Sequence, residues 1–184
     1  MGKYAQVISK GSIWWFDLLK KRRNIMILVL LGTQNNDFTR LLEAVQENIN
    51  NKTINEEVIV QAGFTKFDSK DMKIFSLIDK EKIGKLQDKA DLIISHGGVG
   101  SIVSSLEKGK KVIVVPRLKK YGEHVNNHQI QIAKKFSKDG YVKSVINEKD
   151  LGKAIQSMAD FEPKKYERQE TNIISIIENY IENN

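Results

Sequence analysis

Short apolar segments alternate with longer amphipathic segments along most of the chain. The first apolar segment runs from Ile25 to Leu31 and ends in Gly32 and Thr33. Later segments of the same kind are 58–62, 74–78, 91–95, 111–115 and 141–145. Apolar runs of this length, bounded by turn-forming residues, are typical of buried strands. The pattern therefore predicts a sheet built from these segments.

The stretches between the predicted strands have the periodicity of helices. Asp37 is a suitable cap for the first of them, in which apolar residues recur on one face from Phe38 to Ile49. Further helices are predicted near 80–89, from the turn at 96–101 to Gly109, and at 124–137, 148–159 and 166–181. Strands that alternate with helices of this length indicate a parallel sheet with helices on both faces. We therefore expect a single Rossmann-like α/β domain.

The segment most informative about chemistry is the glycine-rich turn Ser95-His-Gly-Gly-Val-Gly-Ser101. Gly97, Gly98 and Gly100 stand where a strand turns into a helix, so the backbone can approach a ligand and the first N–H groups of the helix can face an anion. Ligands of open α/β sheets bind at that edge, where Ser101 adds a hydroxyl donor. A tight turn that binds nothing is the alternative interpretation.

Two common phosphate-binding motifs do not match this turn. The pattern G-x-G-x-x-G is absent, and Pro116 and Arg117 stand where a dinucleotide site has its acid, about 20 residues further on. The lysine of a P-loop is also missing. A dinucleotide or P-loop site is therefore disfavoured.

Composition limits the class of protein. The chain has 184 residues, 40% of them hydrophobic and 29% charged, which is the balance of one globular domain. It contains no cysteine. A disulfide framework, a thiolate metal site and a cysteine nucleophile are therefore excluded, and a reducing cytoplasm is consistent with the sequence.

The positive charge is concentrated at one end. Residues 1–24 hold six lysines and arginines and one acid, so this segment carries +5 of the net charge of +7. Nucleic-acid binders usually spread basic residues along a recognition surface, so we expect no nucleic-acid partner. The longest apolar run, 25–31, is far shorter than the roughly 20 residues that span a bilayer, and no secretory signal is apparent. Membrane association is expected to be peripheral or to depend on a partner.

Several motifs together resemble the C-terminal domain of family 28 glycosyltransferases. They are the glycine-rich turn, Glu107-Lys-Gly-Lys110, the strand ending in Val115-Pro116, and the opening at 26–34 with Phe38-x-Arg-Leu41. The stand-alone versions of that domain are the most similar. They include the donor-binding subunit of the eukaryotic enzyme that adds the second GlcNAc to dolichol diphosphate, and bacterial subunits of exopolysaccharide and capsule synthesis. The run from Val115 to Gln131 is similar to β-1,4-galactosyltransferase subunits among the bacterial group.

The resemblance covers about residues 26–160 and implies a division of labour. GT-B enzymes have two Rossmann-like halves, of which the C-terminal half holds the UDP-sugar and the other holds the acceptor. Residues 25–162 would be one such half-domain, so we expect a membrane-anchored acceptor-binding subunit as partner, a polyprenyl-diphosphate-linked saccharide as acceptor, and a peripheral position on the cytoplasmic face. The expected reaction is inverting transfer of a hexose, with galactose preferred. GlcNAc or glucose transfer, or a non-catalytic nucleotide-binding module, are the alternatives.

The resemblance also implies roles for particular residues. Around the diphosphate we expect Gly32, Thr33, His96, Gly97, Gly98, Gly100 and Ser101. His128 and Gln129 align with contacts to the donor-sugar hydroxyls, and Arg117 and Asn127 complete the expected set. Gly32 and Thr33 as a simple turn, and Asn126 and Asn127 as helix caps, are the structural alternatives. Many relatives hold the uridine ribose with a glutamate where this chain has Ser104, which leaves ribose recognition open.

The catalytic base and a metal site are harder to place. All three histidines, 96, 124 and 128, fall within the motifs, where a histidine can donate to phosphate or accept a proton. Glu123 and His124 are the candidates for the base of an inverting transfer, although a loop or sugar contact is the alternative for both. We expect no metal and no other cofactor, because no Asp-x-Asp motif is present and backbone N–H groups can stabilise the leaving diphosphate instead.

The two ends of the chain carry separate expectations. Residues 1–24 form an aromatic and basic extension that suits an anionic membrane surface, with packing on a partner or on this domain, or a non-native upstream extension, as the alternatives. Residues 163–184 predict a helix with apolar positions at 173, 174, 176, 177, 180 and 181. We expect it to dock on the missing subunit, with packing on its own sheet as the alternative.

Overall fold

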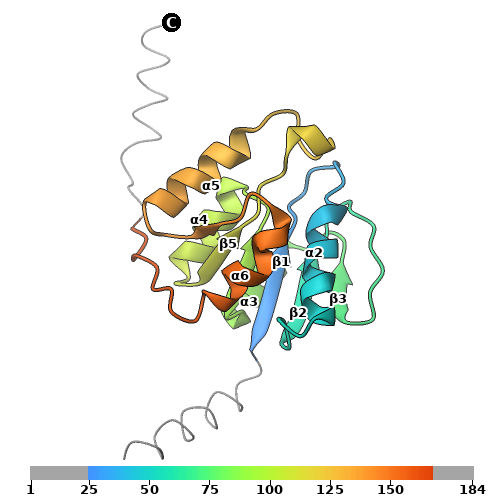
Figure 1. Ribbon diagram of the computed structural model, residues 1–184, viewed down its shortest axis with the longest axis horizontal. Coiled ribbons are helices and arrows are strands. Elements are labelled where there is room, and N and C mark those ends of the chain that lie inside the picture. The colour runs from blue at the N-terminus through green and yellow to red at the C-terminus, as the bar shows by residue number, and fades with distance from the viewer. Residues whose placement is uncertain (1–24, 168–184) are drawn as a thin grey trace, which may run out of the picture.

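The computed structural model describes residues 25–167, and within them one parallel sheet forms the centre of the molecule (Figure 1). The strands are β1 Met26–Leu30, β2 Glu57–Gln61, β3 Met72–Phe75, β4 Leu92–Ser95, β5 Lys111–Val114 and β6 Lys143–Ser144. Their order across the sheet is β3-β2-β1-β4-β5-β6, and every neighbouring pair is parallel. This is the strand order of a doubly wound Rossmann fold. The predicted fold class is confirmed.

Helices cover both faces of this sheet because its central strand is apolar on both sides. The helices are α2 Thr39–Asn50, α3 Lys80–Lys89, α4 Val99–Glu107, α5 His128–Lys138 and α6 Leu151–Gln156. Ile27 and Val29 of β1 belong to a core cluster shared with α2 and α6. Leu28 and Leu30 point the other way, into a cluster shared with α3, α4 and α5. The side chains of a strand alternate between faces, so a run apolar throughout requires cover on both.

Several predicted boundaries differ from the structure. The third strand is 72–75 rather than 74–78, and the last is only 143–144 rather than 141–145. The helix predicted at 124–137 begins only at His128. Residues 122–127 form a loop instead, and this loop follows a short 3-10 helix at 119–121. The stretch 148–159 divides into a 3-10 turn, Glu148–Asp150, and α6. Phe38, not Asp37, is the N-cap residue of α2, although the Asp37 carboxylate accepts from the Thr39 N–H at 3.4 Å.

The expectations for the chain ends fall mostly outside the described residues. Residues 1–24 and 168–184 are not described, and the described part of the C-terminal segment, 163–167, contains no helix. Tyr166 instead packs edge-on against Tyr141, with ring centroids 5.4 Å apart. The chain after α6 therefore returns to α5 and the strand that follows it.

The strand order creates one switch point, between β1 and β4. From β1 the chain proceeds outward through β2 to β3, and then crosses over to β4 and continues outward on the other side. Leu30 is paired with Ser95, so these two strands end side by side. The loops that follow them diverge to opposite faces and leave a crevice, which is where ligands bind in sheets of this type.

Candidate functional site

A cavity of about 700 Å³ lies at this switch point, within the size range of ligand pockets. Gly32 lines it after β1, and His96 and Gly98 line it after β4. Its other walls come from the loop and helix after β3 and from α5. The remaining lining residues are Leu30, Thr33, Gln34, Gln61, Leu77, Ile78, Lys80, Ile83, Gly84, Gln87, Gly100, Ser101, Ser104, Lys108 and Gln129.

His96 occupies the centre of the crevice, between two glycines. A Cβ added at Gly32 would lie 2.5 Å from Nε2 of the His96 ring, and one added at Gly98 would meet the same nitrogen. Gly32 also has a φ of +79°, a conformation that strains other residues. Both glycines are therefore required by the imidazole that packs between them, in addition to any approach of a ligand.

The protonation of His96 follows from its burial. Only 7% of the residue is exposed, and desolvation lowers its pKa to about 4, with the charges of Arg117 and His124 adding to the effect and the bond to Leu30 opposing it. Nδ1 lies 3.1 Å from the carbonyl oxygen of Leu30, which can only accept, so Nδ1 carries the proton of the neutral ring. Nε2 is then an acceptor. Donation from Nε2 to a phosphate would require the protonated ring, so that role of His96 stays a prediction.

The first turn of α4 provides the donors that an anion requires. Gly98 is the N-cap residue, no side chain caps the helix, and its first turn contains no acidic residue. The first N–H groups of a helix have no partner within it, and they combine with the helix dipole to favour an anion. Gly100 and Ser101 lie in this turn and line the cavity. The turn suits a phosphate group.

Gly97 is a glycine because of α5. Its φ is +91°, and an added Cβ would lie 3.2 Å from Cβ of Gln129. Gln129 is 7% exposed, and its Oε1 accepts from the backbone N–H of Arg117 at 3.0 Å. Gln129 thus joins the loop after β5 to the start of α5, and it also lines the cavity. Gly97 itself does not line the cavity.

The residues next to Gln129 are less involved in the cavity. Asn127 accepts from the Lys119 N–H at 3.1 Å and Asn126 from the His128 N–H at 2.9 Å, so both asparagines order the loop before α5. The exposed side chain of His128 contacts Gln131. Neither Asn127 nor His128 lines the cavity. A sugar contact from His128 stays a prediction. Of the two capping candidates, Asn127 is the N-cap residue of α5 without a side-chain cap bond, and Asn126 accepts from the first N–H of the helix.

Arg117 was expected in the binding set, but it is completely buried and does not line the cavity. Its guanidinium donates to the carbonyl oxygens of Leu31 at 3.0 Å, Asn36 at 2.7 Å, Asp37 at 3.2 Å and Glu123 at 3.3 Å. It also lies 4.8 Å from the centroid of the Phe38 ring. Arg117 therefore ties the loop after β1 to the loop after β5 and is not placed to contact a ligand.

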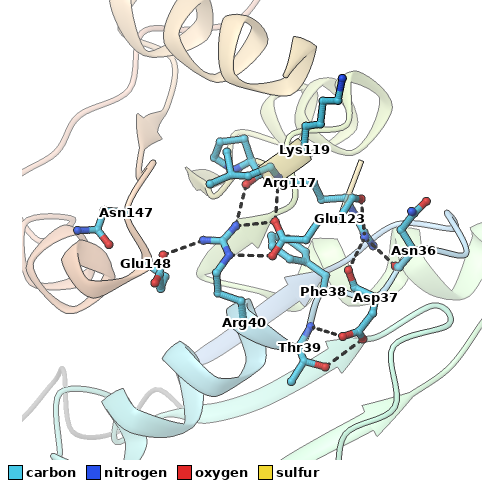
Figure 2. A network of polar contacts seen from close by, with 12 residues as sticks. Asn36, Asp37, Phe38, Thr39, Arg40, Arg117, Lys119, Glu123, Asn147 and Glu148 are labelled. Carbon is cyan, nitrogen blue, oxygen red and sulfur yellow. Dashed lines mark hydrogen bonds and ion pairs between the residues drawn. The ribbon is translucent and has the colours of Figure 1, made fainter. Parts of the chain in front are cut away.

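Glu123, a candidate base, is part of the same internal network (Figure 2). Both of its carboxylate oxygens bind Arg40 at 2.8 Å, and Oε2 also accepts from the Leu118 N–H at 2.8 Å. Arg40 donates in addition to Glu148 at 2.9 Å. The Glu123 side chain is 4% exposed. A carboxylate engaged in this way is not available to deprotonate an acceptor, so the structure contradicts that candidate role.

The network also perturbs the ionisation of its members. Burial opposes the charge of Arg40, but the hydrogen bonds and charges of Glu123 and Glu148 outweigh it and raise the arginine pKa. Burial also opposes the charge of Glu148, which by itself would raise the pKa of its carboxyl group. The backbone hydrogen bond of Glu148 and the nearby Arg40 outweigh burial, so the pKa of Glu148 is lowered. Arg40 and Glu148 are therefore both charged at neutral pH.

His124, the second candidate base, lies on the exposed side of the loop. Its Nδ1 accepts from the Asn126 N–H at 3.2 Å, and Nε2 lies 3.3 Å from the side-chain amide of Gln34, which lines the cavity. Among the residues that line the cavity there is no aspartate or glutamate. Nothing in the described part of the chain thus offers a carboxylate base at this site.

Five polar residues that line the cavity were missed by the sequence predictions, namely Gln34, Gln61, Lys80, Gln87 and Lys108. Gln61 ends β2, and its side-chain amide bonds both the N–H and the carbonyl oxygen of Gly32, at 3.2 and 3.0 Å. Gln87 lies in α3, and Gln34 follows Thr33. Gln61 could have been predicted, because it is a polar residue at the end of an otherwise apolar strand that neighbours the first strand. Gln87 sits in a mostly polar helix, so no comparable signal marks it.

A metal site was not expected. Within residues 25–167, no group of three histidine, aspartate or glutamate side chains is arranged to hold a metal ion. The expectation that the protein acts without a metal stays a prediction.

Comparison with known proteins assigns the fold to a family. The model of the glycosyltransferase family 28 C-terminal domain matches residues 26–183. The chain belongs to this family. The resemblance identified from the glycine-rich turn and the Val115–Gln131 run is thereby confirmed.

Among curated proteins, this family 28 domain is similar to the UDP-N-acetylglucosamine transferase subunit ALG13 of Homo sapiens. The identity is 43% over 63 residues, which is 34% of this chain and 5% of the human protein. The chain thus matches only a small part of that relative's length.

Two solved structures have the same fold. The solution structure of ALG13 has a TM-score of 0.54 and 22% identity, covering 83% of this chain and 94% of that one. The glycotransferase of kitacinnamycin has a TM-score of 0.58 and 18% identity, covering 74% of this chain and 35% of that one. At these identities the likeness concerns the fold, and the match to the second structure spans about a third of its length.

Proposed function

We propose that this chain is the UDP-sugar-binding catalytic subunit of a two-component inverting glycosyltransferase, and that its donor is UDP-GlcNAc. The observation that carries the proposal is the uncapped N-terminus of α4, which opens into a cavity at the switch point of a family 28 domain. Backbone N–H groups in that position stabilise the negative charge of the diphosphate as it leaves.

The identity of the donor sugar is revised by the comparisons. Galactose was the preferred expectation, with GlcNAc among the alternatives. The relatives are UDP-N-acetylglucosamine transferase subunits by name, and they include the human and Candida albicans proteins. They favour the GlcNAc alternative.

The need for a partner follows from the missing base. Inverting transfer requires a group that removes the proton of the acceptor hydroxyl. The cavity lining lacks carboxylates, and Glu123 is bound to Arg40. We infer that a second subunit contributes the base and binds the acceptor, which we propose is a lipid-diphosphate-linked saccharide.

The proposed location is the cytoplasmic membrane face, and it depends on that partner. Within residues 25–167 no helix has the length and apolar character needed to cross a bilayer. The membrane-anchored partner would bring the donor site to its lipid-linked acceptor.

Titration of the full chain with several nucleotides tests the donor assignment. Calorimetry should give binding of UDP and UDP-GlcNAc, weaker binding of UDP-galactose and UDP-glucose, and none of NAD. A transfer assay with the co-expressed partner subunit and the same three sugars then tests the reaction. Binding of NAD without UDP would overturn the proposal. Binding of UDP without any transfer in the reconstituted pair would leave a nucleotide-binding module.

A further inference from the structure

Gln87 is an unusual residue of α3. It is the buried residue of that helix, with 3% of its surface exposed, and it lines the cavity. A buried amide is costly unless its polar atoms have partners. The hydrogen bonds of Gln87 therefore show what its two polar atoms do.

The nitrogen of the Gln87 amide is fully used by α4. Nε2 donates to Oγ of Ser104 at 2.9 Å and to Oγ of Ser105 at 3.0 Å. Each serine hydroxyl has one proton, and both protons go to the carbonyl oxygen of Ser101, at 3.2 and 2.6 Å. The two hydroxyls must then accept from Gln87, because they have no proton left to donate. This count fixes the orientation of the amide.

The Gln87 carbonyl oxygen is left as an acceptor at the cavity wall. Oε1 makes no hydrogen bond within the described residues, although the side chain is almost completely enclosed. Oε1 is not among the fully enclosed polar atoms that lack a partner, so it keeps some accessible surface, and Gln87 is one of the residues that line the cavity. An enclosed acceptor of this kind fits a ligand that brings a hydroxyl or N–H donor.

The two ends of the cavity differ in chemistry. α4 packs between α3, which contacts β1, and α5, which contacts β6. On the α3 side the wall contains the apolar side chains of Leu77, Ile78 and Ile83, whereas Gln129 of α5 lies on the other side. The same wall contains Lys80 of α3 and Lys108, which is paired with Asp88 of α3. A diphosphate at the N-terminus of α4 would therefore have, at one end, a wall that combines an apolar surface, two lysines and the Gln87 amide.

We propose that Oε1 of Gln87 accepts a hydrogen bond from a ribose hydroxyl of the nucleotide, and that Gln87 is the residue that distinguishes ribonucleotide from deoxyribonucleotide donors. This rests on the proposed function. A nucleoside places a flat base, which suits the apolar wall, directly beside a sugar whose hydroxyls are donors. Ser104 holds the amide in position through the hydrogen bond that it accepts from Nε2 of Gln87. The uncharged amide of Gln87 would thus replace an acidic residue as the ribose contact.

The experiment compares the affinities of the full chain for UDP, 2′-deoxy-UDP and 3′-deoxy-UDP by calorimetry. For the unmodified chain at least one deoxy analogue should bind roughly threefold to tenfold more weakly than UDP, the range for one neutral hydrogen bond. In Gln87→Met that ratio should fall to about one, because methionine keeps the size and removes the acceptor. The exposed Gln156→Met, on α6 and away from the cavity, is the matched control and should keep the ratio.

The ratio between ligands separates a contact from a structural role, since general damage weakens all three nucleotides equally. Gln87→Asn keeps an amide but shortens the side chain by one carbon, so that its oxygen no longer reaches the ligand. This variant gives the same test if the methionine variant does not fold. Retention of the ratio in either variant, or equal binding of UDP and both analogues by the unmodified chain, would overturn this inference alone. Failure of the unmodified chain to bind UDP at all would overturn the proposed function with it.

Discussion

The His96 ring and Gly32 are in direct contact across the switch point, so that a side chain at Gly32 would place its Cβ 2.5 Å from Nε2 of the imidazole. The ring is held in that position by the bond from its Nδ1 to the carbonyl oxygen of Leu30. The ends of β1 and β4 are therefore locked together by a neutral histidine, with the turn of α4 directly behind it.

Replacing Gly98 by alanine should disturb this packing. The new Cβ would overlap Nε2 of His96, and the ring cannot move without losing its bond to Leu30. Overpacking of this kind typically lowers the free energy of unfolding by about 1–3 kcal/mol. Gly100→Ala is the control, because nothing lies within 4 Å of the added carbon and alanine favours a helix by up to about 1 kcal/mol. Urea denaturation of both variants measures the difference, and equal midpoints would contradict the packing described for His96.

The stability of the protein should depend on pH through His96. In the unfolded chain this histidine takes up a proton near its ordinary pKa of 6.5, but in the folded protein only near 4. Between these values the unfolded state binds more protons, so the free energy of unfolding falls as the pH is lowered from 6.5 towards 4 and changes no further below it. The loss from this group approaches about 3 kcal/mol.

The comparison that isolates this effect is His96→Asn, which keeps an N–H donor for Leu30 and cannot be protonated. Urea denaturation at several pH values between 4 and 7 should give a flatter dependence for the variant than for the unmodified chain. All other titrating groups are common to both proteins, so parallel curves would show that His96 is not buried in its neutral form.

Glu123→Gln should destabilise the protein without removing a catalytic group. Both oxygens of the Glu123 carboxylate bind the guanidinium of Arg40, whose side chain is 12% exposed, and the neutral amide leaves that buried charge without a full counterion. Breaking a buried pair costs about 3–5 kcal/mol, whereas Glu148→Gln, at the more exposed end of the network, should cost less. Denaturation gives the stability and the transfer rate per folded molecule gives the activity. A loss of rate far beyond the folded fraction would restore Glu123 as the base.

The variant Arg117→Lys tests whether Arg117 holds two loops together or contacts the ligand. An ammonium group cannot reproduce the planar set of bonds that the guanidinium makes to four backbone carbonyls, so we expect the free energy of unfolding to fall by about 1–3 kcal/mol. The affinity of the folded variant for UDP should change little, because the side chain does not line the cavity. A large loss of UDP affinity with unchanged stability would return Arg117 to the binding set.

The sequence predicts the fold of this protein better than it predicts the details of the site. Apolar runs and glycine-rich turns are local signals, so they located every strand and the turn at Gly97 and Gly98. Arg117 and Glu123 were misassigned because their roles depend on partners far away in the chain, Leu31 and Arg40, that no local pattern indicates. The late start of α5 has the same origin, since the loop before it is fixed by these long-range bonds.

An NMR titration of the full chain with UDP, following the backbone amide signals, tests the proposed diphosphate site most directly. The signals of Gly98 and of the first turn of α4, residues 99–101, should move first and furthest, because their N–H groups bind the diphosphate. The amides of α6, on the other face of the sheet, should stay in place. Movement confined to another surface, or no change at UDP concentrations in the millimolar range, would contradict the assignment of the α4 turn as the diphosphate site.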